Sequence, residues 1–222
     1  MQFTRRLLLG ASATAFTLAR PGLVRAQGTT PIRIGEINSY TTQPAFTLPY
    51  RDAMHLAVEE INGKGGVLGR PLELITRDDA GKPQDAVRLA GELLNEAKAD
   101  VLAGAYLSNV GLALGEYAAQ NRRLYVAGEP LTDAMVWEKG NRFTFRLRPS
   151  TYMQASILAE EAAKLPAKRW VTVAPNYEYG QSAVKWFRQI LSARRPDVQF
   201  VGEQWPALGR IDAGATVQAL EG

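Results

Sequence analysis

Three short segments of this sequence carry hydroxyl, amide and aromatic side chains that could bind a small polar molecule. They read NSYTTQPAF (38–46), AYLSN (105–109) and GEPLTDAM (128–135), and each follows an apolar run that predicts a strand. In the second segment Ser108 and Asn109 precede a predicted helix, whose free backbone N–H groups and positive dipole end favour an anion. The same two side chains could instead only cap the helix, and the two roles are compatible.

Two adjacent acids, Asp78 and Asp79, raise the alternative of paired catalytic carboxylates. No nucleophile or base accompanies them in the sequence, which argues against catalysis. We expect both to lie at the end of a strand and to accept hydrogen bonds from nearby backbone N–H groups as Asx turns.

The stretch NGKGGVLGRP (62–71) contains four glycines and a lysine, which raises the alternative of a phosphate-binding loop. Such a loop follows a strand, ends in Gly-Lys-Ser/Thr and opens a helix. Here Lys64 is followed by Gly65, and the stretch comes after a predicted helix and before a predicted strand. We therefore expect Gly63, Gly65 and Gly66 to end the helix and turn the chain back, using positive φ angles.

Composition excludes several kinds of site. The 222 residues contain no cysteine, so a disulfide framework, a thiolate metal site and a cysteine nucleophile are excluded. The single histidine, His55, excludes a multi-histidine metal site and a histidine-based triad. We expect no metal and no cofactor. The net charge of +4 is located in the first 26 residues, whose four arginines stand without an acid; without them, 22 basic residues face 22 acidic ones. We therefore predict no nucleic-acid partner.

Residues 1–26 show the three parts of a secretory signal peptide. Arg5 and Arg6 form the positive start, residues 7–18 form a mildly apolar run, and Ala26 ends a small-x-small cleavage pattern. The apolar run is too short to span a bilayer. The paired arginines resemble a twin-arginine signal, and an ordinary Sec signal remains the alternative. We predict export to the periplasm, with cleavage near Ala26.

Strand and helix patterns alternate along the rest of the chain, which predicts an α/β fold with parallel strands and crossover helices. A break near Pro149 divides the chain into a first lobe, 27–148, and a partial second lobe, 149–222. The second series stops at Gly222 as a new helix begins, so we expect the sequence to be a piece of a longer protein. Strands are expected at 32–37, 72–78, 101–105, 124–128, 143–147, 170–175 and 198–205, and helices at 48–62, 83–97, 111–120, 152–165 and 181–193.

The run from 51 to 94 closely resembles the first lobe of type I periplasmic solute-binding proteins. Within them the nearest group is the branched-chain amino-acid (Leu/Ile/Val) binding family of ABC transporters. The resemblance implies two Rossmann-like lobes with parallel sheets, joined by a hinge and closing on a ligand between them, with the second lobe truncated here. It is carried by Ala57 with Glu60-Ile61-Asn62, Gly65-Gly66, Gly69-Arg70-Pro71, Asp78-Asp79, Pro83 with Ala86, and YGQS (179–182).

The resemblance also implies ligand-binding roles for particular residues. Ser108 and Thr132 would bind a ligand carboxylate through their hydroxyl and backbone N–H groups, and Pro130 would offer its carbonyl to an ammonium group. Phe46 would form an aromatic wall, although it could equally staple the start of a helix. Tyr179 would reach the ligand on closure.

Further candidates are less specific. Tyr40, Asn109 and Tyr177 stand next to the positions above and are alternative contacts. Glu129 and Leu131 depart from the small residues that the family pattern implies. An acid at Glu129 would change the ligand class or meet a cation, or it would point to solvent, as a lone glutamate usually does.

The resemblance implies a periplasmic substrate-binding component of an ABC importer. It would bind an amino acid or a similar small polar solute by hinge closure and deliver it to an ABC permease in the inner membrane. A ligand-sensing subunit of a membrane receptor is the alternative. An exported enzyme on a Rossmann-like fold is a third, and it is disfavoured because NSYTTQ follows the first strand in place of a Gly-x-Gly-x-x-Gly turn. The sequence does not name the ligand.

Overall fold

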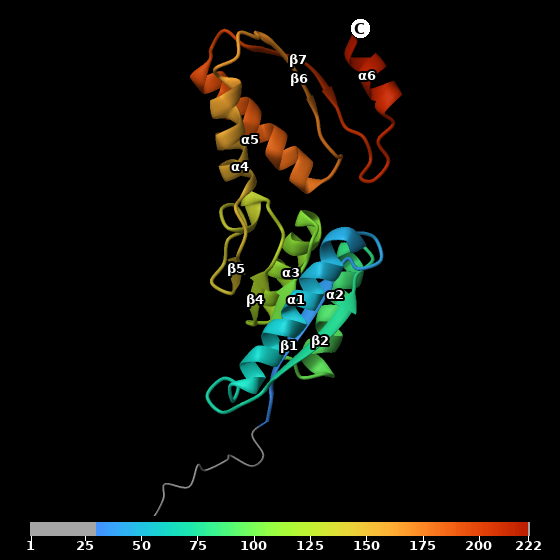
Figure 1. The fold of residues 1–222 in the computed structure, drawn as a ribbon, viewed down its shortest axis with the longest axis vertical. Helices are drawn as coiled ribbons and strands as arrows, with labels where there is room; N and C mark the ends of the chain where they lie inside the picture. The colour runs from blue at the N-terminus through green and yellow to red at the C-terminus, as the bar shows by residue number, and fades with distance from the viewer. Residues whose placement is uncertain (1–29, 222) are drawn as a thin grey trace, which may run out of the picture.

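The computed structural model describes residues 30–221; the predicted signal peptide, 1–26, lies outside this part of the chain. The fold is α/β, as predicted, with two parallel sheets (Figure 1). The five strands of the first sheet stand in the order β2-β1-β3-β4-β5. They are β1 (Ile32–Asn38), β2 (Leu72–Asp78), β3 (Val101–Gly104), β4 (Leu124–Ala127) and β5 (Thr144–Arg146).

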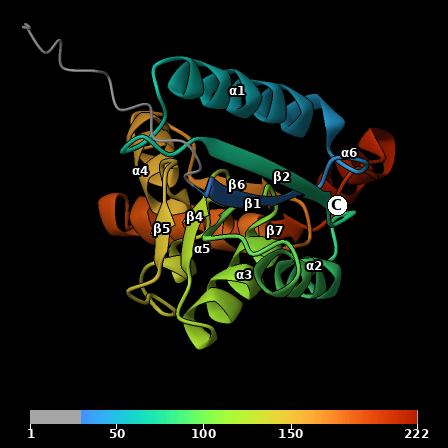
Figure 2. The same ribbon diagram turned by 90° about the horizontal axis from the view of Figure 1, so that it is seen from below.

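Helices cover both faces of this sheet (Figure 2). Helix α1 (Pro44–Gly63) lies on one face, and α2 (Pro83–Asn95) and α3 (Ser108–Gln120) lie on the other. We call the five strands with these three helices the first lobe. Its buried core lies mainly between the sheet and the α2–α3 pair, and includes Ile37, Leu93, Leu102, Leu114 and Tyr125.

A second, smaller unit follows β5 and packs above the first along the long axis of the molecule (Figure 1). We call it the second lobe. It contains α4 (Thr151–Ala162), β6 (Arg169–Val173), α5 (Glu178–Arg194), β7 (Gln199–Gln204) and α6 (Ala213–Glu221), and β6 and β7 pair in parallel. A short 3₁₀ helix, η1 (Asp133–Met135), lies between β4 and β5.

Three helices begin earlier than the sequence pattern predicts. Helix α1 starts at Pro44 rather than 48, α3 at Ser108 rather than 111, and α5 at Glu178 rather than 181. The apolar period that marks a helix starts only where the helix packs on a sheet. The first turn of each of these helices instead carries residues that face the space between the lobes, so the period misses it.

The glycine stretch is a turn, as predicted, and not a phosphate loop. Gly63 is the last residue of α1, and Gly65 and Gly66 follow with φ angles of 100° and 76°. A Cβ atom at Gly66 would lie 2.1 Å from the carbonyl oxygen of Arg70, whereas one at Gly63 would meet nothing within 4 Å. The expected positive φ therefore holds for Gly65 and Gly66 and not for Gly63.

The acid pair forms the predicted Asx turns. Asp78 Oδ1 accepts the N–H of Ala80 at 2.9 Å, and Asp79 Oδ1 accepts the N–H of Gly81 at 2.7 Å. Asp79 is fully buried and also accepts the hydroxyl of Ser39 at 2.7 Å. These bonds fix the loop after β2 against the loop after β1.

The two ends of the glycine stretch should respond differently to alanine. Gly66→Ala should lower the free energy of unfolding by more than about 1 kcal/mol, because the new Cβ meets backbone at an unfavourable φ. Gly63→Ala is the matched control, and it should be neutral or stabilise by up to about 1 kcal/mol. Urea titrations followed by circular dichroism measure both. Equal losses in the two variants would contradict this account of the turn.

Candidate functional site

The carboxyl ends of β1, β3 and β4 meet at one edge of the first sheet, where ligands bind in open α/β folds. The second lobe faces this edge, and between the lobes lies a cavity of about 240 Å³, which we call the interlobe cavity. It is lined by Phe46, Tyr106, Ser108, Glu129, Leu131, Arg148, Gln154, Tyr177 and Tyr179. Both lobes therefore contribute side chains to it.

Aromatic rings form two walls of the interlobe cavity. On the first lobe, Phe46 stacks on Tyr106 with ring centroids 5.2 Å apart and planes 23° apart. On the second lobe, the ring centroids of Tyr177 and Tyr179 lie 6.1 Å apart. Burial raises the pKa of Tyr177 above its ordinary value, so its phenol stays neutral and can donate a hydrogen bond.

Glu129 is buried in this cavity, with only 8 % of its surface exposed. The expectation that it points to solvent is wrong. Its Oε2 lies 3.5 Å from the Nδ2 donor of Asn38, and its Oε1 lies 3.8 Å from a guanidinium nitrogen of Arg148. Burial raises the pKa of Glu129, and the contacts with Asn38 and Arg148 partly offset this rise.

Two backbone hydrogen bonds hold the segment after β4 against the end of β3. The N–H groups of Gly128 and Glu129 donate to the carbonyls of Gly104 and Ala105, and the chain bends at these two residues. In this arrangement Glu129 and Leu131 line the interlobe cavity.

Pro130 and Thr132 are absent from the lining of the cavity. Pro130 packs against α3, where a Cβ on Gly111 would lie 2.5 Å from the proline ring. Thr132 is fully buried and its hydroxyl lies 2.6 Å from a carboxylate oxygen of Glu178, on the second lobe.

Ser108 lines the cavity and connects two loops. Its Oγ accepts the N–H groups of Leu131 and Thr132, each at 3.3 Å. It is the first residue of α3, and no side-chain bond caps that helix, so the structure gives it a role other than capping. Its own hydroxyl proton remains available to a ligand in the cavity. Asn109 is half-buried outside the lining, and its Oδ1 has no hydrogen-bond partner among the residues described.

Tyr40 lies beside the cavity rather than in it. Its hydroxyl donates to Glu36, and the guanidinium of Arg51 lies 5.4 Å from its ring centroid. Four sequence candidates thus come together in one cavity, namely Phe46, Ser108, Tyr177 and Tyr179. The side chains of Tyr40, Asn109, Pro130 and Thr132 lie outside its lining.

Sequence reasoning missed three lining residues. Tyr106 belongs to the segment AYLSN that the sequence singles out, and it stands two residues before Ser108. Arg148 lies in the predicted break between the lobes, where a cation beside Glu129 was a possible signal. Gln154 comes from α4, and nothing in the sequence indicates that it faces the first lobe.

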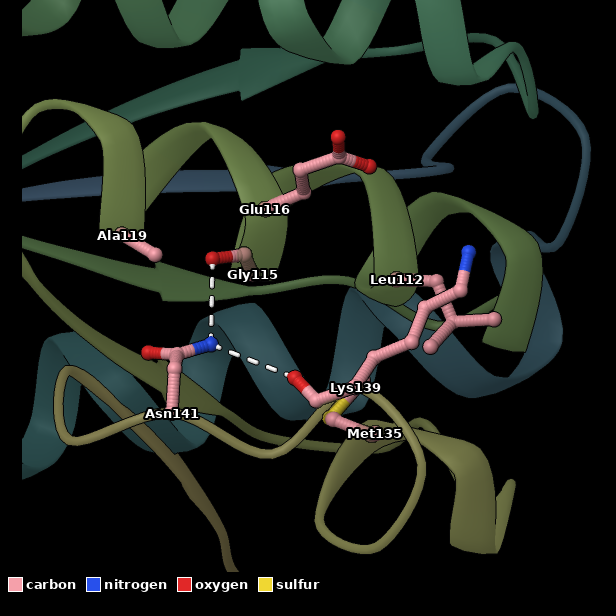
Figure 3. Close-up of a pocket in the computed structure, with 7 residues that line it drawn as sticks. All are labelled: Leu112, Gly115, Glu116, Ala119, Met135, Lys139 and Asn141. Atoms are coloured by element: carbon pink, nitrogen blue, oxygen red, sulfur yellow. Dashed lines mark hydrogen bonds between the residues drawn. The ribbon is translucent and has the colours of Figure 1, made fainter.

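A second hollow, of about 330 Å³, lies on the outer side of α3 (Figure 3). It is lined by Leu112, Gly115, Glu116, Ala119, Met135, Lys139 and Asn141. The side chain of Asn141 spans it with bonds to the carbonyls of Gly115 and Lys139, both 3.5 Å long. It receives no side chain from the second lobe, and we place the candidate site in the interlobe cavity.

Within residues 30–221, no helix is long and apolar enough to cross a membrane. In the same part of the chain, no three histidine, cysteine or acidic side chains gather closely enough to hold a metal ion.

Glu36 lies fully buried under the site, on β1. Tyr40 donates to one of its carboxylate oxygens, and the other has no partner among the described residues. Burial raises its pKa from 4.5 to about 7, and the nearby acids Asp79 and Glu129 add to this rise. The folded protein therefore holds this proton more tightly than the unfolded chain does.

The stability of the protein should consequently fall as this proton is lost. The contribution of Glu36 is fully present below pH 4.5 and is lost as the pH rises through about 7. Over that range the free energy of unfolding should decrease by about 3 kcal/mol. Urea titrations between pH 4 and 8 should show a smaller decrease in Glu36→Gln. Glu59→Gln, on the exposed side of α1, should keep the wild-type slope. An unchanged slope in Glu36→Gln would contradict the assignment.

Comparisons with known proteins agree with this geometry. The sequence pattern of the family described as periplasmic binding protein matches residues 31–222. The Leu/Ile/Val-binding protein BraC3 of Rhizobium johnstonii is 28 % identical over 144 residues, which cover 64 % of this chain and 39 % of that protein.

Two solved structures have the same fold. The solute-binding protein of an ABC transporter from Rhodopseudomonas palustris, in complex with 3,4-dihydroxybenzoic acid, superposes with a TM-score of 0.77 at 23 % identity, over 86 % of this chain and 51 % of that one. The branched-chain amino acid transporter substrate-binding protein LivJ of Streptococcus pneumoniae, in complex with isoleucine, superposes with a TM-score of 0.76 at 22 % identity. The superposition covers 87 % of this chain and 54 % of that one. This chain thus spans about half the length of the solved structures and less of the curated relative. With the family pattern over nearly all of the described residues and two parallel-sheet lobes around one cavity, the chain belongs to the periplasmic binding protein family, in its type I branch, as the sequence resemblance implied.

Proposed function

We propose that this protein is the periplasmic substrate-binding component of an ABC importer and that it binds an amino acid or a small aromatic acid. The observation that carries the proposal is the interlobe cavity, which lies at the carboxyl edge of a parallel sheet and takes side chains from both lobes. The names of the similar proteins agree: one is a Leu/Ile/Val-binding protein, and two solved relatives hold isoleucine or 3,4-dihydroxybenzoic acid.

Binding rather than turnover fits the chemistry of the cavity. Its lining offers a serine, a glutamine, tyrosines and one acid–base pair, and it lacks a nucleophile held by a base. A carboxylate in the cavity would meet the hydroxyl of Ser108 at the start of α3, where the helix dipole favours an anion. Tyr177 and Tyr179 would cover it from the second lobe.

Hinge closure is the proposed mechanism, with the chain crossing between the lobes at Arg148–Ser150. A ligand that touches both walls binds the closed arrangement better than an open one, and it shifts the population by that difference. Contacts beside the crossing hold the lobes together here. Thr132 bonds to Glu178, and the hydroxyl of Thr151 bonds both to Asp133 and to Ser182, at 2.6 Å each.

The proposed partner is an ABC permease in the inner membrane, and a membrane receptor that senses the loaded protein is the alternative. Either partner would bind the closed arrangement of the two lobes. Uptake of radiolabelled amino acid by cells lacking this protein separates them, because an importer subunit is needed for uptake and a sensor subunit is not.

A thermal-shift screen of the intact mature protein tests the proposal. A compound present at 100 times its dissociation constant should add about 2.7 kcal/mol of stability. The panel contains the twenty amino acids, benzoate, 4-hydroxybenzoate and 3,4-dihydroxybenzoate, and at least one should raise the melting temperature by several degrees. No shift with any of them would contradict the proposed ligand class. Chemical conversion of a stabilising compound would revive the enzyme alternative.

Ser108→Ala should weaken the affinity for the compound found by that screen by about 10-fold to 100-fold. The reason is that a hydrogen bond to a charged group contributes about 1.5–3 kcal/mol. Ser156→Ala, at a half-buried position of α4 whose hydroxyl bonds within its own helix, is the matched control and should bind like the wild type. Isothermal titration calorimetry measures both. Wild-type affinity in Ser108→Ala, with the fold intact by circular dichroism, would remove Ser108 from the site.

A further inference from the structure

Glu129 is an acid in an unusual position. It is almost fully buried, yet its two partners are distant: the Asn38 amide at 3.5 Å and an Arg148 nitrogen at 3.8 Å. A buried carboxylate is costly unless short hydrogen bonds satisfy its oxygens. The other side of this carboxylate is the interlobe cavity. A cationic or hydrogen-donating group of a ligand would therefore find an acceptor there.

Arg148 provides the complementary charge. Its side chain is 47 % exposed, and Glu129 is its one ion-pair partner within the described residues. The guanidinium carries five N–H donors, of which a pair 3.8 Å long uses little. A carboxylate entering the cavity could bind this fork and the Ser108 hydroxyl together.

The two charges sum to zero, which constrains what can bind. A ligand with only a negative charge would leave Glu129 buried beside it, and a ligand with only a positive charge would face Arg148. A zwitterionic ligand satisfies both residues, because its cationic group can pair with Glu129 and its anionic group with Arg148. Like-charge contacts in a desolvated site cost several kcal/mol, so this charge arrangement disfavours simple acids and simple amines.

The aromatic walls constrain the rest of the ligand. Phe46 and Tyr106 present rings from the first lobe, and Tyr177 and Tyr179 present rings from the second. Phe46 remains 55 % exposed although it stacks on Tyr106, so its ring is open to further contact. Ring-to-ring contacts are more favourable than area burial alone. A flat ring of the ligand between the two walls would make ring-to-ring contacts on both of its faces.

Resting on the proposed solute-binding function, we propose that Glu129 and Arg148 make this cavity selective for an aromatic amino acid. The ammonium group binds Glu129, the carboxylate binds Arg148 and Ser108, and the ring lies between the Phe46–Tyr106 and Tyr177–Tyr179 walls. Glu129 is thus a specificity-determining residue of this chain.

The test uses calorimetric titration of the intact mature protein with four probes: L-phenylalanine, 3-phenylpropionate, which lacks the ammonium group, phenethylamine, which lacks the carboxylate, and L-leucine, which lacks the ring. Wild-type protein should bind L-phenylalanine at least 10-fold more tightly than each of the other three. This comparison needs no variant, so it stands even where a substitution prevents folding.

Substitutions of Glu129 and Arg148 test which charged group of the ligand each residue binds. Glu129→Gln should weaken binding of L-phenylalanine at least 10-fold, because the ammonium group loses its acceptor, and should strengthen binding of 3-phenylpropionate, because the buried like charge is gone. Arg148→Met should weaken binding of L-phenylalanine at least 10-fold and strengthen binding of phenethylamine, for the corresponding reason. Glu161→Gln removes an exposed acid that pairs with Lys164 within the second lobe and is the matched control, with wild-type affinities throughout.

Three results would overturn the inference and leave the proposed function standing. They are binding of any of the other three probes as tight as that of L-phenylalanine, an equal loss for all probes in Glu129→Gln, and binding of a compound of the thermal-shift panel with none of the four probes bound. Failure of every compound, in this panel and in the thermal-shift panel, would instead overturn the proposed function together with the inference.

Discussion

Parallel pairing of β1, β3 and β4 is the constraint on which the rest of the site depends. Because these strands run in the same direction, their carboxyl ends meet at one edge, and the loops after them lie side by side. The polar groups that close this edge bond to one another: Ser39 to Asp79, and Ser108 to the backbone after β4. The first lobe therefore presents a preorganised surface rather than three independent loops.

The fold could be predicted from the sequence because the spacing of apolar residues and the positions of turn residues both depend on local structure. The run LELITRD was placed at 72–78, where β2 lies, and the glycine stretch was assigned to a turn. The same reasoning located the three loops of the site. The resemblance supplied what periodicity cannot, namely the expectation that two lobes close around one ligand.

Side-chain direction within those loops was not available from the sequence. The segment after β4 bonds to the end of β3 and bends at Gly128 and Glu129, and only the structure shows that Glu129 and Leu131 line the cavity while Pro130 and Thr132 do not. The burial of Glu129 was missed for the same reason, since an isolated glutamate is usually exposed. Contacts from the other lobe, such as Gln154, depend on how two separately folded units meet, and no local pattern encodes that.

The proposed binding of an aromatic amino acid between the lobes can be tested by a crystal structure of the intact mature protein grown with L-phenylalanine. We expect density for the amino acid between the Phe46–Tyr106 and Tyr177–Tyr179 walls, with its ammonium group within 3.2 Å of Glu129, as a direct hydrogen bond requires. Density in the hollow beside α3, or an amino acid in the cavity whose ammonium group points away from Glu129, would contradict it.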